Sequence, residues 1–318
     1  MLHRSQLETD DGWTLGLRRW GAGGADKPPV LLVPGYGTNA NIYGFHPDGP
    51  GFMETLARRG FDPWSVDLRG QGDGRKTGLR RGRPIRLGEQ ALVDLPLVLR
   101  HIQGVTGSDR IHTVGGSLGG ALLYILLAHQ PDAPVGKLVT VSSPLRWDDR
   151  HPVVRAFSAA GPLISQLPMR GSRTAARYGL PLAAKLAPTL AARLLSIYMT
   201  VDKFDLEDTV ELVRSIEDPD GHLSRQLAAW IRARDLIVRG VNIREALAAV
   251  TNPLLVITAS ADGIVPSATA RSAMHAIGGE TTHVEVGGPG DPWAHVDLFI
   301  GAGARERVFT PVADWLAR

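Results

Sequence analysis

One stretch, residues 111–121, constrains the fold of this chain of 318 residues more than any other. It begins with apolar and β-branched residues and passes into Gly-Gly-Ser-Leu-Gly at residues 115–119. A run of helix-forming composition follows at residues 121–129. This order predicts a buried strand, a tight turn and a helix.

The serine of that turn, Ser117, is the first candidate for a reactive group. A serine at the tip of a strand–turn–helix takes a strained backbone conformation, and its Oγ then projects into solvent. Gly115 and Gly119 keep the crowded turn free of Cβ clashes. Because a helix that begins after the serine aims its free N–H groups at the same point, we expect the Leu118 N–H beside this nucleophile.

Strands and helices alternate through most of the chain. Apolar runs that predict buried strands occur at residues 30–33, 61–66, 111–116, 137–141, 253–258 and 281–286. A hairpin is expected before them, with strands at 6–9 and 13–20 around an Asp-Asp-Gly turn. The alternation predicts an α/β fold with a mostly parallel, doubly wound sheet, in which ligands bind at the carboxyl ends of the strands.

The alternation stops between residues 145 and 250, where no convincing strand is predicted. Three apolar stripes with helical spacing occur there instead. They are Leu206/Val210/Val213/Ile216, Leu190/Leu194/Leu195/Tyr198 and Leu223/Leu227/Trp230/Ile231. We therefore expect a core domain of residues 1–144 and 251–318, with a helical cap inserted at 145–250.

A nucleophilic serine needs a general base, and His295 is the best candidate. His295 lies in the loop after the last predicted strand, whereas His275 and His283 fall within a predicted helix and a predicted strand. Asp262 follows the preceding strand and is the preferred acid. The order serine, aspartate, histidine along the chain favours Asp262 over Asp67, which we expect to order its own glycine-rich loop.

With these motifs the sequence resembles the α/β-hydrolase superfamily, and within it esterases and lipases. The resemblance covers residues 1–144 and 251–318. It rests on Pro34-Gly35-Tyr36-Gly37, Asp67-Leu68-Arg69-Gly70-Gln71-Gly72, Gly115-Gly116-Ser117-Leu118-Gly119, Asp262-Gly263-Ile264-Val265-Pro266 and His295. Residues 295–301 are similar to the His-x-Asp-x-x-x-Gly segment of acid-type lipases. Many members have His in place of Pro34 and of Gly116; both departures reshape the floor of the pocket and remove no catalytic atom.

The resemblance implies a serine hydrolase that cleaves carboxylic esters of apolar acyl groups through an acyl-enzyme on Ser117. His295 would be the base, Asp262 would orient it, and the N–H groups of Tyr36 and Leu118 would form the oxyanion hole. Further candidates for lining the pocket are Gly35, Gly116 and Trp293, and a place in the core suits Trp293 equally well. The expected partner is a small-molecule ester with an apolar acyl or alcohol group, and this chemistry needs no metal or organic cofactor.

Other functions fit the same residues. Lactone, amide or carbon–carbon bond hydrolysis and acyl transfer use the same triad, and a ligand-binding protein of this fold without catalysis is a further alternative. The net charge of +3 is too small to indicate nucleic-acid binding, and the lack of cysteine excludes disulfides and thiolate chemistry.

The termini and surface add two expectations. No apolar run approaches the ~18 residues of a transmembrane helix, and the first residues lack the apolar core of a secretory signal, so we expect a cytoplasmic protein. A basic stretch is interpreted as a solvated loop, with a site for anions or membrane headgroups as the alternative. It comprises Arg75, Lys76, Arg80, Arg81, Arg83 and Arg86.

Overall fold

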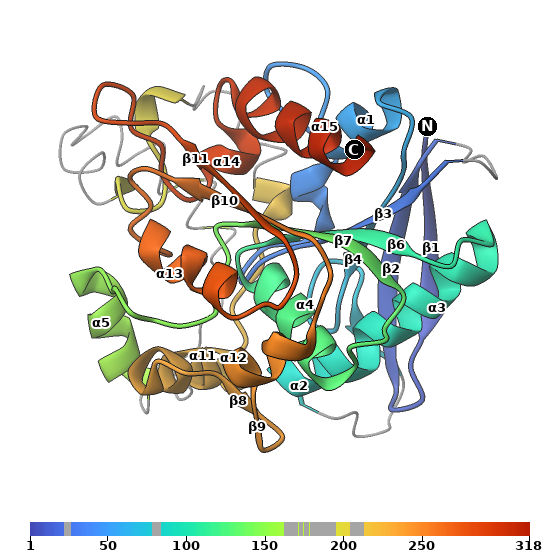
Figure 1. The fold of residues 1–318 in the computed structure, drawn as a ribbon, viewed down its shortest axis with the longest axis horizontal. Coiled ribbons are helices and arrows are strands. Elements are labelled where there is room, and N and C mark those ends of the chain that lie inside the picture. The colour runs from blue at the N-terminus through green and yellow to red at the C-terminus, as the bar shows by residue number, and fades with distance from the viewer. Residues whose placement is uncertain are drawn as a thin grey trace.

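A sheet of nine strands forms the centre of the molecule (Figure 1). The computed structural model describes residues 1–21, 27–77, 84–161, 171, 174, 178, 195–203 and 213–318. The strands of this sheet are β1 (Leu2–Glu8), β2 (Trp13–Trp20), β3 (Pro29–Val33), β4 (Asp62–Asp67), β5 (Arg75–Lys76), β6 (Ile111–Gly116), β7 (Val135–Val141), β10 (Leu254–Ala259) and β11 (Thr281–Val286). Their order across the sheet is β1-β2-β4-β3-β6-β7-β10-β11, and β5 pairs with β2.

The predicted doubly wound α/β sheet is confirmed. All pairs from β4 to β11 along the sheet are parallel, whereas β1, β2 and β4 pair in antiparallel fashion. The hairpin of β1 and β2 turns at Gly12, whose φ of 86° favours glycine. The residues of β3 and β10 are buried throughout, as expected for strands covered on both faces.

Helices cover both faces of the sheet, and Figure 1 shows the two layers. One face carries α2, α3, α4 and α13, and the opposite face carries α1, α14 and α15. The helical segments are η1 (Ala40–Tyr43), α1 (Phe52–Arg58), α2 (Leu87–Glu89), η2 (Gln90–Asp94), α3 (Leu95–Thr106), α4 (Leu118–His129), α5 (Pro152–Ala159), η4 (Val201–Lys203), α11 (Gly221–Ala233), α12 (Ile243–Ala246), η5 (Leu247–Ala249), α13 (Ser267–Arg271), η6 (Ser272–His275), α14 (Asp297–Ile300), η7 (Arg305–Phe309) and α15 (Thr310–Ala317). Among the described residues, none of these helices is long and apolar enough to cross a membrane.

The sequence predicts that residues 296–316 close the chain as one helix, and the structure departs from this prediction. The helix α14 ends at Ile300, and a break that begins at Gly301 separates it from η7 and α15. Gly303 in this break has a φ of 86°, a conformation that a right-handed helix cannot contain. The apolar spacing continues across the break, which is why the sequence pattern does not reveal it.

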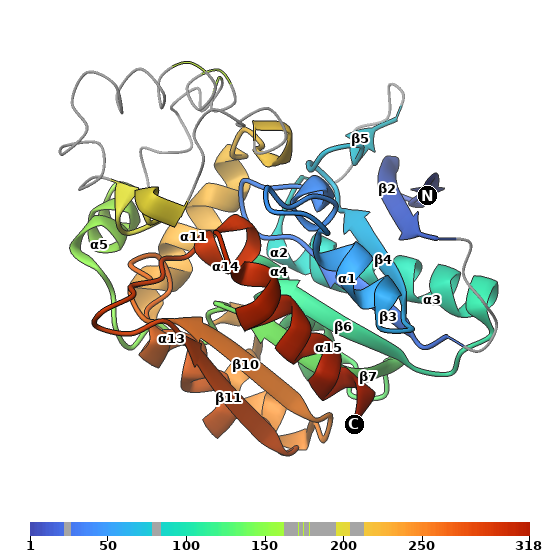
Figure 2. The same ribbon diagram turned by 90° about the horizontal axis from the view of Figure 1, so that it is seen from above.

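Residues 145–250 contain helices and one feature that the sequence prediction missed. The stripe on α11 is buried as predicted, and Asp220 caps this helix by accepting the N–H groups of His222 and Leu223. The prediction of no strand here was wrong, because β8 (Ile237–Val238) and β9 (Val241–Asn242) form a small antiparallel pair. Two residues are too few to produce an alternating pattern. The helices α5 and α11 pack together at one end of the molecule (Figure 2).

Some sequence predictions concern residues outside the described part. They are Leu190, Leu194, Leu206 and Val210 of the apolar stripes, and Arg80, Arg81 and Arg83 of the basic stretch.

The structure predicts a pH-dependent stability that involves His112. Its Nδ1 accepts the Lys137 N–H at 3.0 Å, and burial, followed by the charge of Lys137, lowers the pKa of His112. Near and below the ordinary histidine pKa of about 6.5, the unfolded chain binds more protons than the folded protein. The free energy of unfolding should therefore decrease as the pH is lowered from about 7.5 to about 5.5. Urea denaturation at each pH measures it.

The control for this prediction is His112→Asn, whose side-chain oxygen can accept the same N–H without titrating. The variant should show a smaller pH dependence, which persists in part because the pKa values of His46, His101 and His283 are also lowered by burial. An unchanged pH dependence in the variant would contradict the assignment to His112.

Candidate active site

Ser117 stands at the turn between β6 and α4, in a conformation that its neighbours enforce. Its φ of 51° and ψ of −119° are strained for a residue with a Cβ. A Cβ on Gly119 would lie 2.1 Å from the Val33 carbonyl oxygen, and one on Gly115 would lie 2.4 Å from the backbone of Gly120. Only glycine fits at these two positions, so the turn can pack against the sheet with the serine side chain outward.

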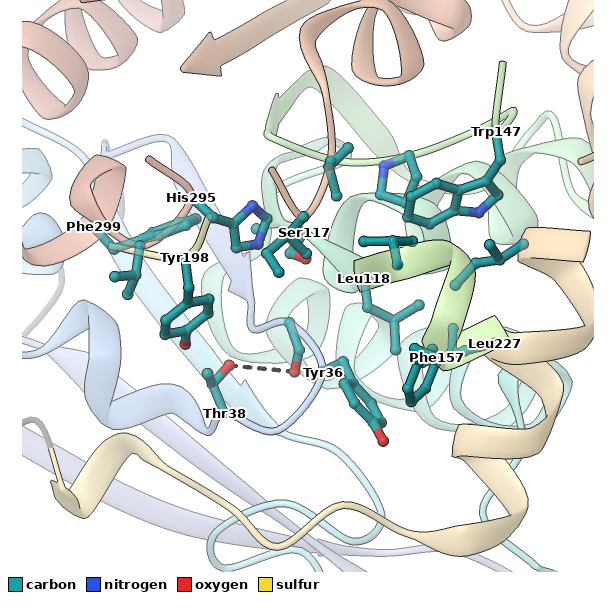
Figure 3. A pocket seen from close by; sticks show the side chains of 18 of the residues that line it. Tyr36, Thr38, Ser117, Leu118, Trp147, Phe157, Tyr198, Leu227, His295 and Phe299 are labelled. Carbon is teal, nitrogen blue, oxygen red and sulfur yellow. Dashed lines mark hydrogen bonds between the residues drawn. The ribbon is translucent and has the colours of Figure 1, made fainter. Parts of the chain in front are cut away.

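Asp262 and His295 meet although 33 residues separate them in the chain. They lie in the loops after β10 and β11, and His295 Nδ1 is 2.7 Å from Asp262 Oδ2. The other carboxylate oxygen of Asp262 accepts the N–H groups of Ile264 and Val265, each at 2.8 Å. Both residues are buried. Figure 3 shows the His295 ring turned toward Ser117, so the carboxylate holds an imidazole that faces the serine.

The loop after β3 passes directly beside the serine. A Cβ on Gly35 would lie 2.9 Å from Ser117 Cβ, so this loop can approach only because residue 35 has no side chain. Within the described part of the chain, the backbone N–H groups of Tyr36 and Leu118 have no acceptor. Two unpaired donors next to a serine are the geometry that can stabilise an oxyanion.

A cavity of about 310 Å³ opens above Ser117 (Figure 3). Its described lining contains no Asp, Glu, Lys or Arg. The lining residues from 145–250 are Trp147, Val153, Val154, Phe157, Tyr198, Leu227, Trp230 and Ile231. Ser117 and His295 lie at the floor of this apolar cavity, and Gly35, Tyr36, Gly116 and Leu118 also line it.

Gly116 and Trp293, two of the residues that the sequence analysis proposed for the pocket, differ in their surroundings. A Cβ on Gly116 would lie 2.8 Å from the Tyr43 hydroxyl oxygen and 2.9 Å from the Phe299 ring, so these aromatic side chains occupy that part of the floor. Trp293 does not line the cavity. It is buried in the core, its Nε1–H donates to Asp291, and Lys203 lies 4.6 Å from its ring centroid. Of the two places that the sequence allowed for Trp293, the pocket and the core, the structure shows the core.

The segment of residues 195–203, here called the strap, connects the two loops that carry Asp262 and His295. The Ile197 carbonyl accepts the Gly263 N–H at 3.0 Å, and the Tyr198 carbonyl accepts the Val296 N–H at 2.9 Å. The Tyr198 ring lies 6.2 Å from the His295 ring, centroid to centroid. Sequence reasoning placed Tyr198 in a helical stripe and gave no signal for these contacts, which are mostly backbone bonds.

Asp297 completes this connection. Its carboxylate is fully buried and accepts the Thr200 N–H at 3.0 Å and the Ala294 N–H at 2.7 Å. Burial raises the pKa of Asp297, and the hydrogen bonds oppose this shift. From the sequence, a carboxylate in the first turn of the last helix suits the helix dipole. The structure adds a second role, in which Asp297 joins the strap to the His295 loop.

Asp67, the acid that the sequence analysis did not prefer, binds partners other than His295. Arg18 Nη2 lies 2.8 Å from Asp67 Oδ2, and both side chains are buried. The same carboxylate accepts the N–H groups of Ala40 and Asp73. Asp67 thus fixes the two glycine-rich loops around the serine, while Asp262 is the carboxylate that meets His295. Among the described residues, no group of three or more His, Cys, Asp and Glu side chains could hold a metal ion.

Comparisons with known proteins place this geometry in a family. A model of the alpha/beta hydrolase fold matches residues 28–291. The chain belongs to the alpha/beta hydrolase fold family. A search of curated proteins gives no match to its sequence.

Solved structures share the fold over nearly the whole chain. An esterase from Exiguobacterium antarcticum is 16% identical, with a TM-score of 0.66 over 99% of this chain and 100% of that one. An enol-lactonase from Burkholderia xenovorans is 17% identical, with a TM-score of 0.64 over 99% of this chain and 100% of that one. A hydrolase from Pseudomonas aeruginosa is 20% identical, with a TM-score of 0.63 over 99% of both chains.

The different environments of the two aspartates predict different effects of neutralising them. Asp67→Asn leaves Arg18 without its buried counter-charge and should lower the free energy of unfolding by about 3 kcal/mol. Asp262→Asn should change stability less, but in a mechanism that uses Ser117, His295 and Asp262 it should lower kcat about ten-thousand-fold, because the imidazole would lose the partner that sets its tautomer. Urea denaturation and turnover per folded protein measure the two effects. A silent Asp262→Asn would show that the acid lies elsewhere.

Proposed function

We propose that this protein is a serine hydrolase that cleaves carboxylic esters of apolar acyl groups through an acyl-enzyme on Ser117. One observation carries the proposal: His295 is bound to Asp262 at 2.7 Å and faces Ser117 on the floor of an apolar cavity. The esterase, lactonase and hydrolase among the solved structures are consistent with hydrolytic chemistry and leave the bond type open.

The proposed reaction has two halves. Ser117 Oγ attacks the acyl carbonyl carbon while His295 Nε2 takes the hydroxyl proton, and the tetrahedral intermediate expels the alcohol as His295 returns the proton to it. Water then attacks the acyl-enzyme with the same base, and the carboxylic acid leaves as the proton returns to Ser117 Oγ. Asp262 holds the imidazole in the required tautomer and stabilises the imidazolium.

The oxyanion of each tetrahedral intermediate would be bound by the N–H groups of Tyr36 and Leu118. Each such donor typically contributes about 3 kcal/mol to transition-state stabilisation. Their lack of other acceptors in the described structure supports this role, because a donor already bonded to the protein would have to break that bond first. The positive end of α4 adds to the field at the same point.

The cavity supports an apolar substrate. A carboxylate or sugar group placed among Leu118, Trp147, Leu227 and Ile231 would lose its hydration and would meet no charged partner in the described lining. Each methylene buried in the same place gains about 0.8 kcal/mol. Ester hydrolysis with selection for apolar acyl groups is therefore the activity that the site supports best.

The first test is Ser117→Ala. The variant should keep the fold and lose nearly all esterase activity, since the nucleophile is gone and the residual transition-state stabilisation is small by comparison. A fluorophosphonate probe should label the native protein on Ser117 and leave the variant unlabelled. Circular dichroism and thermal unfolding verify the fold. Labelling or turnover that persists in the variant would refute the proposal, and an unlabelled native protein would favour a ligand-binding protein without catalysis.

A second test concerns the acyl chain. With p-nitrophenyl esters, kcat/KM should rise several-fold for each added pair of methylenes until the cavity is full. Val154→Trp narrows the cavity and should shift the best substrate to a shorter chain. The control is Val105→Trp, an exposed position on α3, which should leave the profile unchanged. A flat profile, or a preference for acetyl over butyryl and hexanoyl, would contradict selection by the cavity.

A further inference from the structure

The peptide between Gly35 and Tyr36 must face one particular way for the Tyr36 N–H to reach an oxyanion. In a trans peptide the carbonyl and the N–H point in opposite directions, and the described chain contains no cis peptide. Whatever holds the Gly35 carbonyl oxygen therefore decides where the Tyr36 N–H points. This peptide can rotate with little steric resistance on one side, because Gly35 has no side chain.

Among the residues that the structure describes, two side chains donate to the Gly35 carbonyl oxygen. Gln71 Nε2 donates to it at 3.0 Å, and Thr38 Oγ1 donates at 3.3 Å, a bond drawn as a dashed line in Figure 3. Thr38 belongs to the same loop and moves with it. Gln71 comes from the loop after β4, so it restrains the peptide from a separate part of the fold.

Gln71 is itself fixed at both ends. Its side chain is buried, its Oε1 accepts the Leu68 N–H at 3.1 Å, and its own backbone N–H donates to the Leu68 carbonyl at 2.9 Å. Because Oε1 faces a donor, the NH₂ group of the amide is the part that faces Gly35. Among the described residues that line the cavity, Gln71 is absent, so it would act on the reaction only through the peptide that it holds.

We propose that Gln71 is the positioning residue of the oxyanion hole. It pulls the Gly35 carbonyl away from Ser117 and thereby turns the Tyr36 N–H toward the reacting carbonyl. The close approach of this loop to Ser117 requires a glycine, and the same glycine leaves the peptide free to rotate; Gln71 supplies the missing restraint. This inference rests on the proposed serine hydrolase activity.

The decisive experiment compares Gln71→Met with the native enzyme. Without the amide donor, the peptide should spend less time in the productive orientation, so kcat should fall about 10- to 100-fold while KM changes little. An alkyl trifluoromethyl ketone, which forms an anionic adduct on the serine, should lose affinity by a similar factor. Ground-state binding of the corresponding alkyl methyl ether should be unaffected, because it places no charge in the oxyanion hole.

Gln90→Met is the matched control. Gln90 is also buried, and its Nε2 donates to the Arg69 carbonyl at 3.2 Å, in the same loop as Gln71 but away from Gly35. The control should lose stability to a comparable degree and keep the native kcat and the native affinity for the ketone. If both variants lose ketone affinity equally, Gln71 has only a structural role and the inference is wrong.

A pH series on Gln71→Glu gives an independent readout. The ionised carboxylate repels the Gly35 carbonyl, whereas the protonated acid can donate to it in place of the amide. The ratio of variant to native kcat should therefore rise as the pH falls toward the ordinary glutamate pKa of about 4.3. Taking the ratio removes the titration that both enzymes share. A ratio independent of pH would overturn the inference.

Two outcomes separate this inference from the proposed function. If the native protein hydrolyses esters and Gln71→Met binds the ketone with native affinity, the positioning role fails while the hydrolase function stands. If the native protein neither turns over esters nor reacts with the fluorophosphonate, the proposed function fails, and the inference fails with it. Should Gln71→Met not fold, Thr38→Val removes the second donor to the same oxygen and should weaken ketone binding in the same direction by a smaller factor.

Discussion

The site depends on the contact between two neighbouring strand ends. β3 and β6 are paired in parallel, with Val33 opposite Gly115, so the loops that follow them leave the sheet side by side. The contact is so close that the Val33 carbonyl lies where a Cβ of Gly119 would be. The serine hydroxyl and the two backbone donors can share one small volume only because glycines, such as Gly35 and Gly119, let the backbone segments approach each other closely. Asp67 and Arg18 then hold the surrounding loops from the opposite side.

The remaining parts of the site come from the far half of the sheet. β7 separates β6 from β10, and β11 is the edge strand, so the loops that carry Asp262 and His295 have to reach back across the carboxyl edge. Backbone hydrogen bonds on Asp262, the buried Asp297 and the strap hold these loops in their extended paths. The chain thus uses local turns to place Ser117 and long-range bonds to place Asp262 and His295.

The sequence revealed those parts that leave a local pattern. Apolar runs, glycine spacing and the order of Ser117, Asp262 and His295 were sufficient to predict the α/β sheet and to select the residues that the structure brings together. It did not reveal bonds between backbone atoms distant in sequence, such as those of Ile197 and Tyr198, because a carbonyl oxygen carries no side-chain signature. Gln71 was visible only as one residue of a glycine-rich loop. The sequence left Trp293 open between pocket and core, because nearness in sequence to His295 does not determine which way a ring points.

The strap has a consequence for engineering the substrate range of this protein. Exchanging the segment above the cavity for that of another enzyme is an obvious way to alter selectivity, and such a graft is normally designed around the side chains that face the substrate. Here the grafted segment would also have to supply two main-chain carbonyls, at the positions of Ile197 and Tyr198, to the loops beneath it. A transplant that matches the cavity wall but does not supply these two carbonyls would also disturb the contact between Asp262 and His295. The ends of such a graft should therefore lie outside residues 195–203, so that the strap is kept whole.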